Sequence, residues 1–268
     1  MLGINPLSTP RYRLEVSAET DTGLQREHNE DHLAFSLRDR DTAVLAVVAD
    51  GMGGYQGGAE ASRQVVEDLQ SQASRLFDNP VSGNMLCDLI YSANDRLYRF
   101  SRSHLGTPGM GTTVIALRIQ HGLANYAFVG DSRLYRIRNG ACLQLSNDHT
   151  LVAQMVRDGL LTEEQALDHP DRNVITRALG TSAQIEVEAC LQALPIEIGD
   201  RYLLCSDGLY ESLTTADIAQ VIANHSTAQA CRQLIALANA RGGHDNISAL
   251  LVKVCPRDVT KKLPLTRT

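Results

Sequence analysis

The chain has 268 residues, of which 43% are hydrophobic and 21% charged, proportions that are ordinary for a globular protein with a sizeable core. Its formal net charge of -6 argues against a nucleic-acid partner, because a nucleic-acid binder normally carries a basic face. The N-terminal residues lack the pattern of a signal peptide, and the longest apolar run, Ala43–Ala49, is too short to span a membrane. Six cysteines are scattered without a CxxC pair. We therefore expect a cytoplasmic protein with no membrane insertion.

The first half of the chain predicts strands followed by helices. Strands are expected at Tyr12–Ala18, His32–Leu37 and Ala43–Ala49, and helices at Gly58–Phe77 and Asn84–Ser103, where apolar residues recur at helical spacing. The run Ala43–Ala49 is uninterrupted, which is typical of a strand that is buried on both faces.

The middle of the chain returns to strands and then to two short helices. The strands are expected at Thr113–Ile119, Leu123–Val129 and Arg133–Arg138, and the helices at Thr150–Asp158 and Thr162–Leu167. Thr162 is placed to cap the second helix, and Gly159 to end the first. The segment that follows, His169–Gly180, shows no regular pattern.

The last third alternates again, with strands at Ile185–Leu191, Arg201–Cys205 and Ile247–Val254 and helices at Thr215–Ala223 and Thr227–Ala240. Strands cluster with pairs of helices between them, which favours an α+β layered sandwich over a doubly wound parallel sheet. No linker or repeat divides the chain. We expect a loose N-terminus at 1–10, a single domain at 11–255 and a flexible tail at 256–268.

Acidic side chains stand at the ends of several predicted strands. They are Asp50, Asp131, Asp207 and Asp245, each beside a glycine or a turn, and the pair Glu30 and Asp31, which opens another strand. A single Asp at a strand end is usually turn chemistry. Several together could converge, and converging carboxylates repel one another unless they hold cations. Because Mg²⁺ and Mn²⁺ prefer oxygen ligands, the pattern indicates a site for hard metal ions.

Patterns typical of rival sites are absent or incomplete. No Cys-x5-Arg loop, Gly-Lys dipeptide or GxSxG elbow occurs, and the Gly51-x-Gly53 pair has Gln56 where a dinucleotide fingerprint needs glycine. His28 and His32 are four residues apart, a spacing that would suit zinc on a helix. Their segment is expected to run from a loop into a strand, so a zinc site there is disfavoured.

Eight motifs in order resemble the metal-dependent protein phosphatase family, also called protein phosphatase 2C, in its bacterial branch. They are TGLQREHNED (Thr22–Asp31), VVADGMGGYQGGAEAS (Val47–Ser62), GMGTTV (Gly109–Val114), FVGDSRLYRI (Phe128–Ile137), SNDHT (Ser146–Thr150), HPDRNVITRALG (His169–Gly180), LLCSDGLYE (Leu203–Glu211) and GGHDNIS (Gly242–Ser248). The resemblance extends from about Leu14 to Val254. It implies a four-layer α-β-β-α sandwich, with two central, mostly antiparallel sheets flanked by helix pairs.

The resemblance also implies roles for the acidic residues. Asp50 resembles the ligand that bridges two metals, with the carbonyl of Gly51 completing the first site. Asp207 and Asp245 resemble ligands of the second metal, and Asp131, with Asp207, matches the ligands of a weaker third. Two or three Mn²⁺ or Mg²⁺ ions per chain are therefore implied.

Three further residues match positions around the metals and the substrate. Glu30 and Asp31 resemble residues that bind a metal directly or hold its waters, and Arg26 matches the position that binds the substrate phosphate. The implied reaction is direct hydrolysis of phosphoserine and phosphothreonine in proteins by water activated between two metals, without a phosphoenzyme. The implied partners are phosphoproteins, including a Ser/Thr kinase or its targets, and the chain is expected to be a monomer.

The sequence departs from many eukaryotic members at the residue after Asp50-Gly51. That position, where they have a histidine proposed as the general acid, is Met52, which cannot donate a proton. The bacterial branch usually has Met there. A metal-bound water is the first candidate for the acid, and His149 and His244 are alternatives that are otherwise interpreted as structural.

The segment of about 150–173 matches the flap of bacterial members, where Arg157, Glu163, Glu164 and Arg172 would tune the choice of substrate. Two other functions stay open. A catalytically dead relative would bind phosphoproteins, but such relatives typically lose metal aspartates and none is lost here. The other function that stays open is that of a regulatory phosphatase acting on an anti-sigma-factor antagonist, although the chain has no room for a fused sensor domain.

Overall fold

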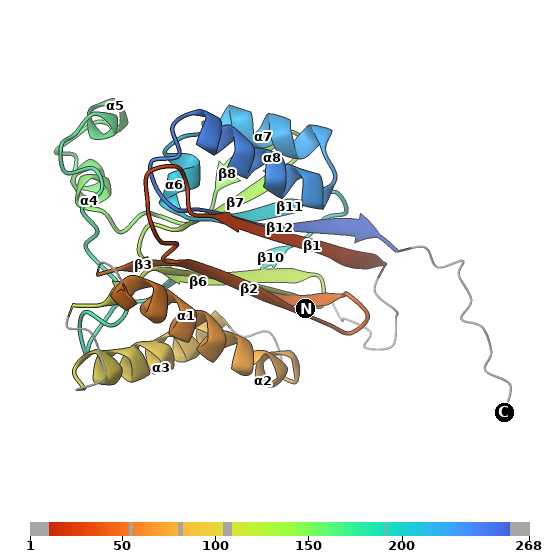
Figure 1. The fold of residues 1–268 in the computed structure, drawn as a ribbon. Helices are drawn as coiled ribbons and strands as arrows, with labels where there is room; N and C mark the ends of the chain where they lie inside the picture. Colours follow the sequence, from red (N-terminus) through yellow and green to blue (C-terminus); the bar gives the residue numbers. More distant parts are fainter. Residues whose placement is uncertain (1–10, 54–55, 80–82, 104–108, 191, 258–268) are drawn as a thin grey trace, which may run out of the picture.

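The computed structural model describes residues 11–53, 56–79, 83–103, 109–190 and 192–257. Two antiparallel β-sheets pack face to face, and helices cover the outer face of each (Figure 1). The predicted α+β fold, a four-layer α-β-β-α sandwich, is confirmed. The N-terminus at 1–10 and the tail beyond Arg257 lie outside the described residues.

The first sheet has the strand order β1-β12-β11-β7-β8. Its members are β1 (Tyr12–Asp21), β12 (Ile247–Pro256), β11 (Arg201–Cys205), β7 (Arg133–Arg138) and β8 (Ala141–Gln144). Strands from the two ends of the chain, β1 and β12, pair over ten residues each, from Tyr12 opposite Pro256 to Asp21 opposite Ile247. This long pairing ties the beginning of the chain to its last strand.

The second sheet has the order β10-β6-β5-β3-β2, with β4 paired to β3 and β9 paired to β6. Its members are β10 (Leu194–Pro195), β6 (Leu123–Val129), β5 (Val114–Gln120), β3 (Ala43–Met52), β2 (Asp31–Arg38), β4 (Gly111–Thr112) and β9 (Glu188–Ala189). The hairpin of β2 and β3 puts Asp31 directly opposite Asp50. Two acidic residues that are 19 positions apart thus become neighbours at one end of this sheet.

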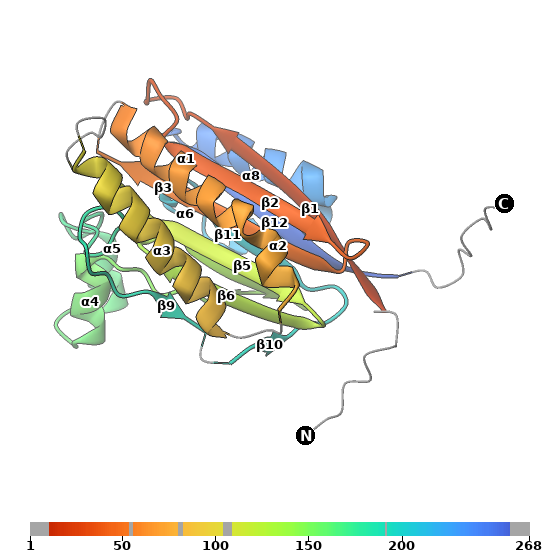
Figure 2. The same ribbon diagram turned by 90° about the horizontal axis from the view of Figure 1, so that it is seen from below.

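Helices fall into two covering layers and one projecting segment. The second sheet is covered by α1 (Gln56–Ser71), α2 (Ala73–Phe77) and α3 (Gly83–Ser101), which lie across it in Figure 2. The first sheet is covered by α6 (Asp207–Tyr210), α7 (Thr215–Asn224) and α8 (Thr227–Ala240), and α4 (Leu151–Arg157) and α5 (Glu163–Leu167) project beside the sandwich. No helix in the described ranges has the length and apolar character that a membrane crossing requires.

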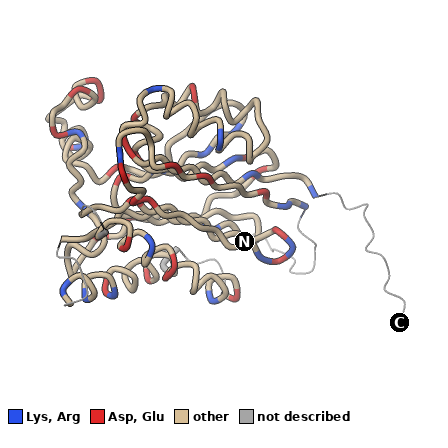
Figure 3. The backbone as a smooth tube through the Cα atoms, viewed as in Figure 1, with Lys and Arg blue, Asp and Glu red and all other residues tan. Residues whose placement is uncertain are grey.

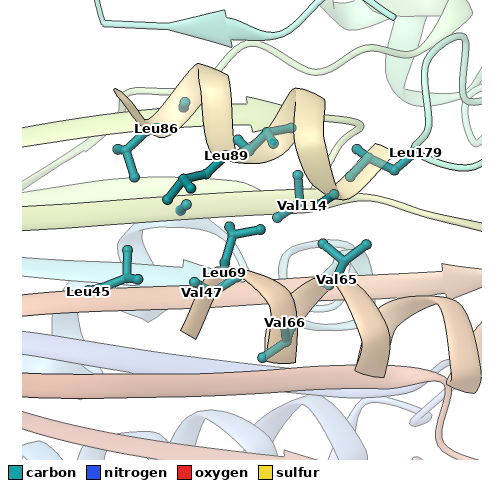
Figure 4. Close-up of a cluster of buried hydrophobic side chains, with 14 of the residues drawn as sticks. Leu45, Val47, Val65, Val66, Leu69, Leu86, Leu89, Val114 and Leu179 are labelled. Carbon is teal, nitrogen blue, oxygen red and sulfur yellow. The ribbon is translucent and has the colours of Figure 1, made fainter. Parts of the chain in front are cut away.

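Three apolar cores, formed by residues within the described ranges, hold these layers together. One lies between the sheets, one under α7 and α8, and one under α1 and α3, where Leu45 and Val47 of β3 pack with Val65 and Leu69 of α1 (Figure 4). Because side chains alternate along a strand, β3 also sends Val48 into the core between the sheets. The expectation that Ala43–Ala49 is buried on both faces is confirmed.

The structure differs from the sequence-based expectations in the shorter elements. The helix expected at Gly58–Phe77 is two helices, α1 and α2, separated at Gln72. The strand expected at Ile185–Leu191 is reduced to the two residues of β9. Elements of two to four residues, such as β4, β8, β10 and α6, were not expected, because so short a stretch shows no periodicity. The predicted cap is confirmed, since Thr162 forms a capping box at the start of α5.

Candidate active site

The strand-end aspartates come together where the two sheets meet. Asp50 lies near the end of β3 in the second sheet, whereas Asp207 follows β11 and Asp245 precedes β12 in the first. All three line an open pocket of about 520 Å³. Figure 3 shows acidic positions at the ends of the central strands, on the side of the molecule that carries α4 and α5. The sandwich therefore assembles the site from both sheets.

Among the described residues, acidic side chains and Arg26 line the pocket. Its lining residues are Arg26, Glu27, His28, Glu30, Asp50, Gly51, Met52, Gly53, Ile175, Asp207, Asp245 and Asn246. Arg26 is held by Asp245, since its Nη2 lies 2.7 Å from Asp245 Oδ2, yet 55% of the Arg26 side chain is exposed. An exposed guanidinium at the mouth of a pocket is suited to binding an anionic group, because its planar fork matches phosphate oxygens.

The backbone of Asp50 is held by two threonines. Its N–H donates to Thr113 Oγ1 (2.9 Å), and its carbonyl accepts from Thr113 N–H (2.8 Å) and from Thr112 Oγ1 (2.8 Å). Thr113 Oγ1 in turn shares a hydrogen bond with Ser132 Oγ (2.7 Å). These contacts fix the main chain of Asp50 at the end of β3.

Gly51 has to be glycine where β3 meets the start of α1. A Cβ added there would lie 2.1 Å from the Gly58 carbonyl oxygen and 2.6 Å from the Glu30 carbonyl oxygen. The same crowding appears at Gly58, where a Cβ would lie 2.4 Å from Glu30 Oε2. Glycine thus allows α1 and the segment before β2 to approach the end of β3 closely.

Asp31 is buried beside Asp50, and only one of its two carboxylate oxygens accepts a hydrogen bond from the described residues. Its Oδ2 accepts a hydrogen bond from Ser206 Oγ (2.6 Å), and Ser206 Oγ accepts from Ser248 N–H (3.0 Å). Its Oδ1 has no hydrogen-bond partner among the described residues. Burial raises the pKa of the Asp31 carboxyl to about 6, although the Ser206 hydrogen bond opposes the rise.

Asp131 and Asp207 also have carboxylate oxygens that lack a hydrogen-bond partner within the described ranges. Each has a buried Oδ1 for which the described part of the chain offers no partner. Burial raises the pKa of Asp131 to about 6, and the charge of Asp148 adds to the rise. Burial is the largest cause that raises the pKa of Asp207, and the negative charge of Asp131 is the next. The pKa of Asp50 is raised by burial and then by the charge of Asp31.

Buried carboxylates that repel one another and retain unpaired oxygens are suited to divalent cations. The donors are all oxygen, as Mg²⁺ and Mn²⁺ prefer. Within the described ranges, no three Asp, Glu, His or Cys side chains form a ready-made metal cage. Mg²⁺ usually keeps several waters and binds only one or two carboxylates, so the residues present fit a hydrated ion of this kind.

Asn246 fixes the segment that carries Arg26 and Glu30. Its Nδ2 donates to the carbonyls of Thr22 and His28 (2.9 Å each), and its Oδ1 accepts from Glu30 N–H (2.8 Å). Burial raises the pKa of the Glu30 carboxyl, and the charge of Arg26 opposes the rise. The loop before β2 is therefore pinned to the segment before β12.

Several residues of the site were given no role from the sequence. Thr113, Ser206 and Asn246 hold the acidic residues, and Ile175 lines the pocket. All four lie within the quoted motifs, which is the signal that could have identified them. His28, considered from the sequence only as a zinc ligand, also lines the pocket. His28 lies in the loop before β2 and its zinc-spaced neighbour lies in β2, so this pair is not on a helix.

The two histidines considered as general acids do not line the pocket. His149 is buried, and its ring stacks on Phe128 with 5.1 Å between centroids. Its Nδ1 accepts from Gly130 N–H (3.1 Å), so the proton is on Nε2, 3.2 Å from Glu188 Oε2. Burial lowers the pKa of His149. His244 is exposed and contacts Gln25. Both contacts suit structural histidines.

The segment expected to be the flap contains α4 and α5 and stands apart from the sandwich (Figure 1). Arg157 donates to the Asp148 carbonyl (3.3 Å), and Arg172 opposes the rise in the pKa of Glu211 that burial causes. Glu163 and Glu164 lie in the first turn of α5. None of these four flap residues lines the pocket, which Ile175 borders just beyond the flap.

Comparison with known proteins gives consistent results over most of the chain. A family model described as protein phosphatase 2C matches residues 24–251. The serine/threonine phosphatase stp of Listeria monocytogenes (serotype 4b, strain F2365) is 34% identical over 253 residues, covering 93% of this chain and 98% of that protein.

Solved structures of serine/threonine phosphatases are also similar to this chain. The S. agalactiae serine/threonine phosphatase has a TM-score of 0.80 and 35% identity, covering 90% of this chain and 99% of that one. The catalytic domain of the phosphatase PstP, solved in complex with two manganese ions, has a TM-score of 0.79 and 30% identity, covering 91% and 99%.

Proposed function

This chain belongs to the protein phosphatase 2C family of metal-dependent phosphatases, and we propose that it hydrolyses phosphoserine and phosphothreonine in other proteins. The observation that carries the proposal is the pocket where Asp50, Asp207 and Asp245 meet, flanked by buried carboxylate oxygens that lack partners among the described residues. Its relatives are named serine/threonine phosphatases, which supports this choice of substrate class.

Two Mn²⁺ or Mg²⁺ ions would be held by the acidic residues of the pocket. Asp50 and the Gly51 carbonyl are the proposed ligands of the first, with Asp50 shared, and Asp207 and Asp245 those of the second. A relative solved with two manganese ions supports these two ions. Asp131, which like Asp207 keeps a buried Oδ1 without a partner among the described residues, would hold a third ion together with Asp207. Ions bound here would activate water for attack on phosphorus.

The remaining residues of the site would bind the metal ions, their waters or the substrate phosphate. Glu30 and Asp31 border Asp50 and would contact the ions directly or hold their waters. Arg26, freed from Asp245 when metal binds there, would bind the phosphate oxygens with its guanidinium. Met52 lines the pocket but carries no acidic proton, and neither His149 nor His244 lines it, so water is the proposed proton donor to the leaving oxygen.

The substrates are proposed to be phosphoproteins, among them a Ser/Thr kinase or its targets. The flap of about 150–173 would contact the residues around the phosphorylated side chain, because Ile175, two residues beyond the flap, borders the pocket. The monomeric state stays a prediction.

Turnover of phosphopeptides tests the proposal. The chain should release phosphate from phosphoserine and phosphothreonine peptides with Mn²⁺ present, and a chelator or Asp207→Asn should remove this activity. A tyrosine-phosphorylated peptide of the same sequence serves as the control for substrate class. Equal turnover in chelator would contradict the metal mechanism. Calorimetry that shows Mn²⁺ binding without any turnover would favour a phosphoprotein-binding role instead.

A further inference from the structure

Tyr210 contacts one of the proposed metal ligands. It lies three residues after Asp207 at the end of α6, and its hydroxyl donates to Asp131 Oδ2 (3.3 Å). The other oxygen of Asp131, Oδ1, is buried and has no partner among the described residues. The hydroxyl thus occupies one oxygen of the carboxylate and leaves the other free for a cation.

The ring of Tyr210 is held in place from the side. The Arg133 guanidinium carbon lies 3.5 Å from the ring centroid, a cation–π contact that fixes the plane of the ring. Arg133 is anchored by Asp148, which accepts from Nε (3.0 and 3.1 Å) and from Nη2 (2.5 Å), and its Nη1 donates to Tyr135 Oη (3.0 Å). A guanidinium with this many partners cannot move away from the ring without breaking them.

Asp131 and Asp207 share a feature that suits a common cation. Each keeps a buried Oδ1 that has no partner among the described residues. Side chains that orient metal ligands through hydrogen bonds commonly change metal affinity when they are removed. Tyr210 bears on both residues, since it belongs to the same helical turn as Asp207 and is bonded to Asp131.

We propose that Tyr210 is a positioning residue: its hydroxyl, held by the Arg133–Asp148 pair, orients Asp131 so that Oδ1 stays available for a cation shared with Asp207. This inference rests on the proposed function. It names a residue that sets the metal affinity of the proposed third and weakest site, the one shared by Asp131 and Asp207. Tyr210 is not among the residues that line the pocket.

The substitution Tyr210→Phe removes the hydroxyl and keeps the ring under Arg133. Calorimetric titration with Mn²⁺ should show the weakest binding event weakened about tenfold, with the tighter events unchanged. Turnover should fall at low Mn²⁺ and recover at high Mn²⁺. Thermal unfolding of the metal-free protein should be nearly unchanged, which shows that the variant folds.

Tyr202→Phe is a matched control. The Tyr202 hydroxyl also donates to a buried aspartate, Asp200 Oδ2, at 3.3 Å, in a network with Arg138 away from the pocket. Its Mn²⁺ isotherm should equal that of the unmodified protein. In a double-mutant cycle, Tyr210→Phe should have no further effect on Mn²⁺ binding once Asp131→Asn is present, because the hydroxyl acts through that carboxylate.

Three outcomes decide against the inference. An unchanged isotherm in Tyr210→Phe overturns it, as does equal weakening in Tyr202→Phe or a full additional loss on top of Asp131→Asn. If the unmodified chain binds no Mn²⁺ at all, the proposed function itself fails, which the first titration distinguishes from failure of the role of Tyr210 alone.

Discussion

Arg26 and Asp245 form an ion pair at the mouth of the pocket, with 2.7 Å between Nη2 and Oδ2. Because 55% of the Arg26 side chain and 31% of the Asp245 side chain are exposed, the pair contributes little to stability. Asp245 instead keeps the guanidinium at the pocket, where a phosphate group can replace the carboxylate as its partner.

Replacing Arg26 with alanine should therefore impair catalysis far more than folding. A charged hydrogen bond contributes about 1.5–3 kcal/mol, so kcat/KM for a phosphopeptide should fall about 10- to 100-fold while thermal unfolding changes little. Arg96→Ala is the control, since Arg96 forms an equally short ion pair with Asp68 (2.7 Å) between α1 and α3. Equal losses in both variants would contradict the role of Arg26.

The raised pKa values of Asp31 and Asp131, both about 6, predict a pH-dependent effect of metal on stability. Between about pH 4 and 6 these groups hold protons in the folded, metal-free protein that the unfolded chain has already lost. Their contribution to metal-free stability is therefore present at low pH and is lost as pH rises through 6. A cation binds the deprotonated carboxylates and relieves the repulsion between them, which grows as the pH rises and they lose their protons.

The rise in Tm caused by Mn²⁺, relative to chelator, should consequently increase from pH 5 to pH 7. Thermal unfolding at pH 5, 6 and 7 measures it. Asp31→Asn and Asp131→Asn should each flatten the dependence, because the amide does not titrate. A rise that stays constant or shrinks toward pH 7 would show that these carboxylates do not couple to the metal.

At the scale of elements, the site depends on how closely α1 and the end of β3 approach each other. Gly51→Ala would put a Cβ 2.1 Å from the Gly58 carbonyl oxygen, so the two elements must separate. We expect stability to fall by about 1–3 kcal/mol, as for other overpacked sites, and phosphatase activity to be largely lost. Chemical denaturation and a phosphopeptide assay measure the two effects.

Gly199→Ala provides the comparison for this prediction. Gly199 has a φ of +99° with open space around the added Cβ, so the substitution introduces backbone strain without a steric contact. It should cost about 1 kcal/mol or more in stability and leave activity unchanged. Full activity in Gly51→Ala would mean that the close approach is not needed.

Over the whole molecule, the site lies where two sheets meet, so its geometry depends on the core between them. Ile115→Ala, in that core and two residues after Thr113, should lower the free energy of unfolding by about 2–5 kcal/mol and also weaken Mn²⁺ binding. Ile222→Ala, in the core under α7, should cost a similar free energy and leave Mn²⁺ binding unchanged. Denaturation and calorimetry on both variants test this, and equal Mn²⁺ affinities would contradict it.

The sequence by itself determined the long elements and the identity of the acidic residues. An uninterrupted apolar run located β3, and apolar residues at helical spacing located α3 and α8, because each pattern extends over seven or more residues. The aspartates at strand ends could be recognised as a site because turn chemistry explains one Asp after an apolar strand but does not readily explain several.

Only the tertiary structure decided which side chains hold those aspartates. Ser206 bonds Asp31 across 175 residues, and Tyr210 bonds Asp131 across 79. Such contacts arise when strands of two sheets converge, and no local pattern encodes them. The same convergence buries the carboxylates, raises their pKa values and turns separate strand-end aspartates into one acidic site.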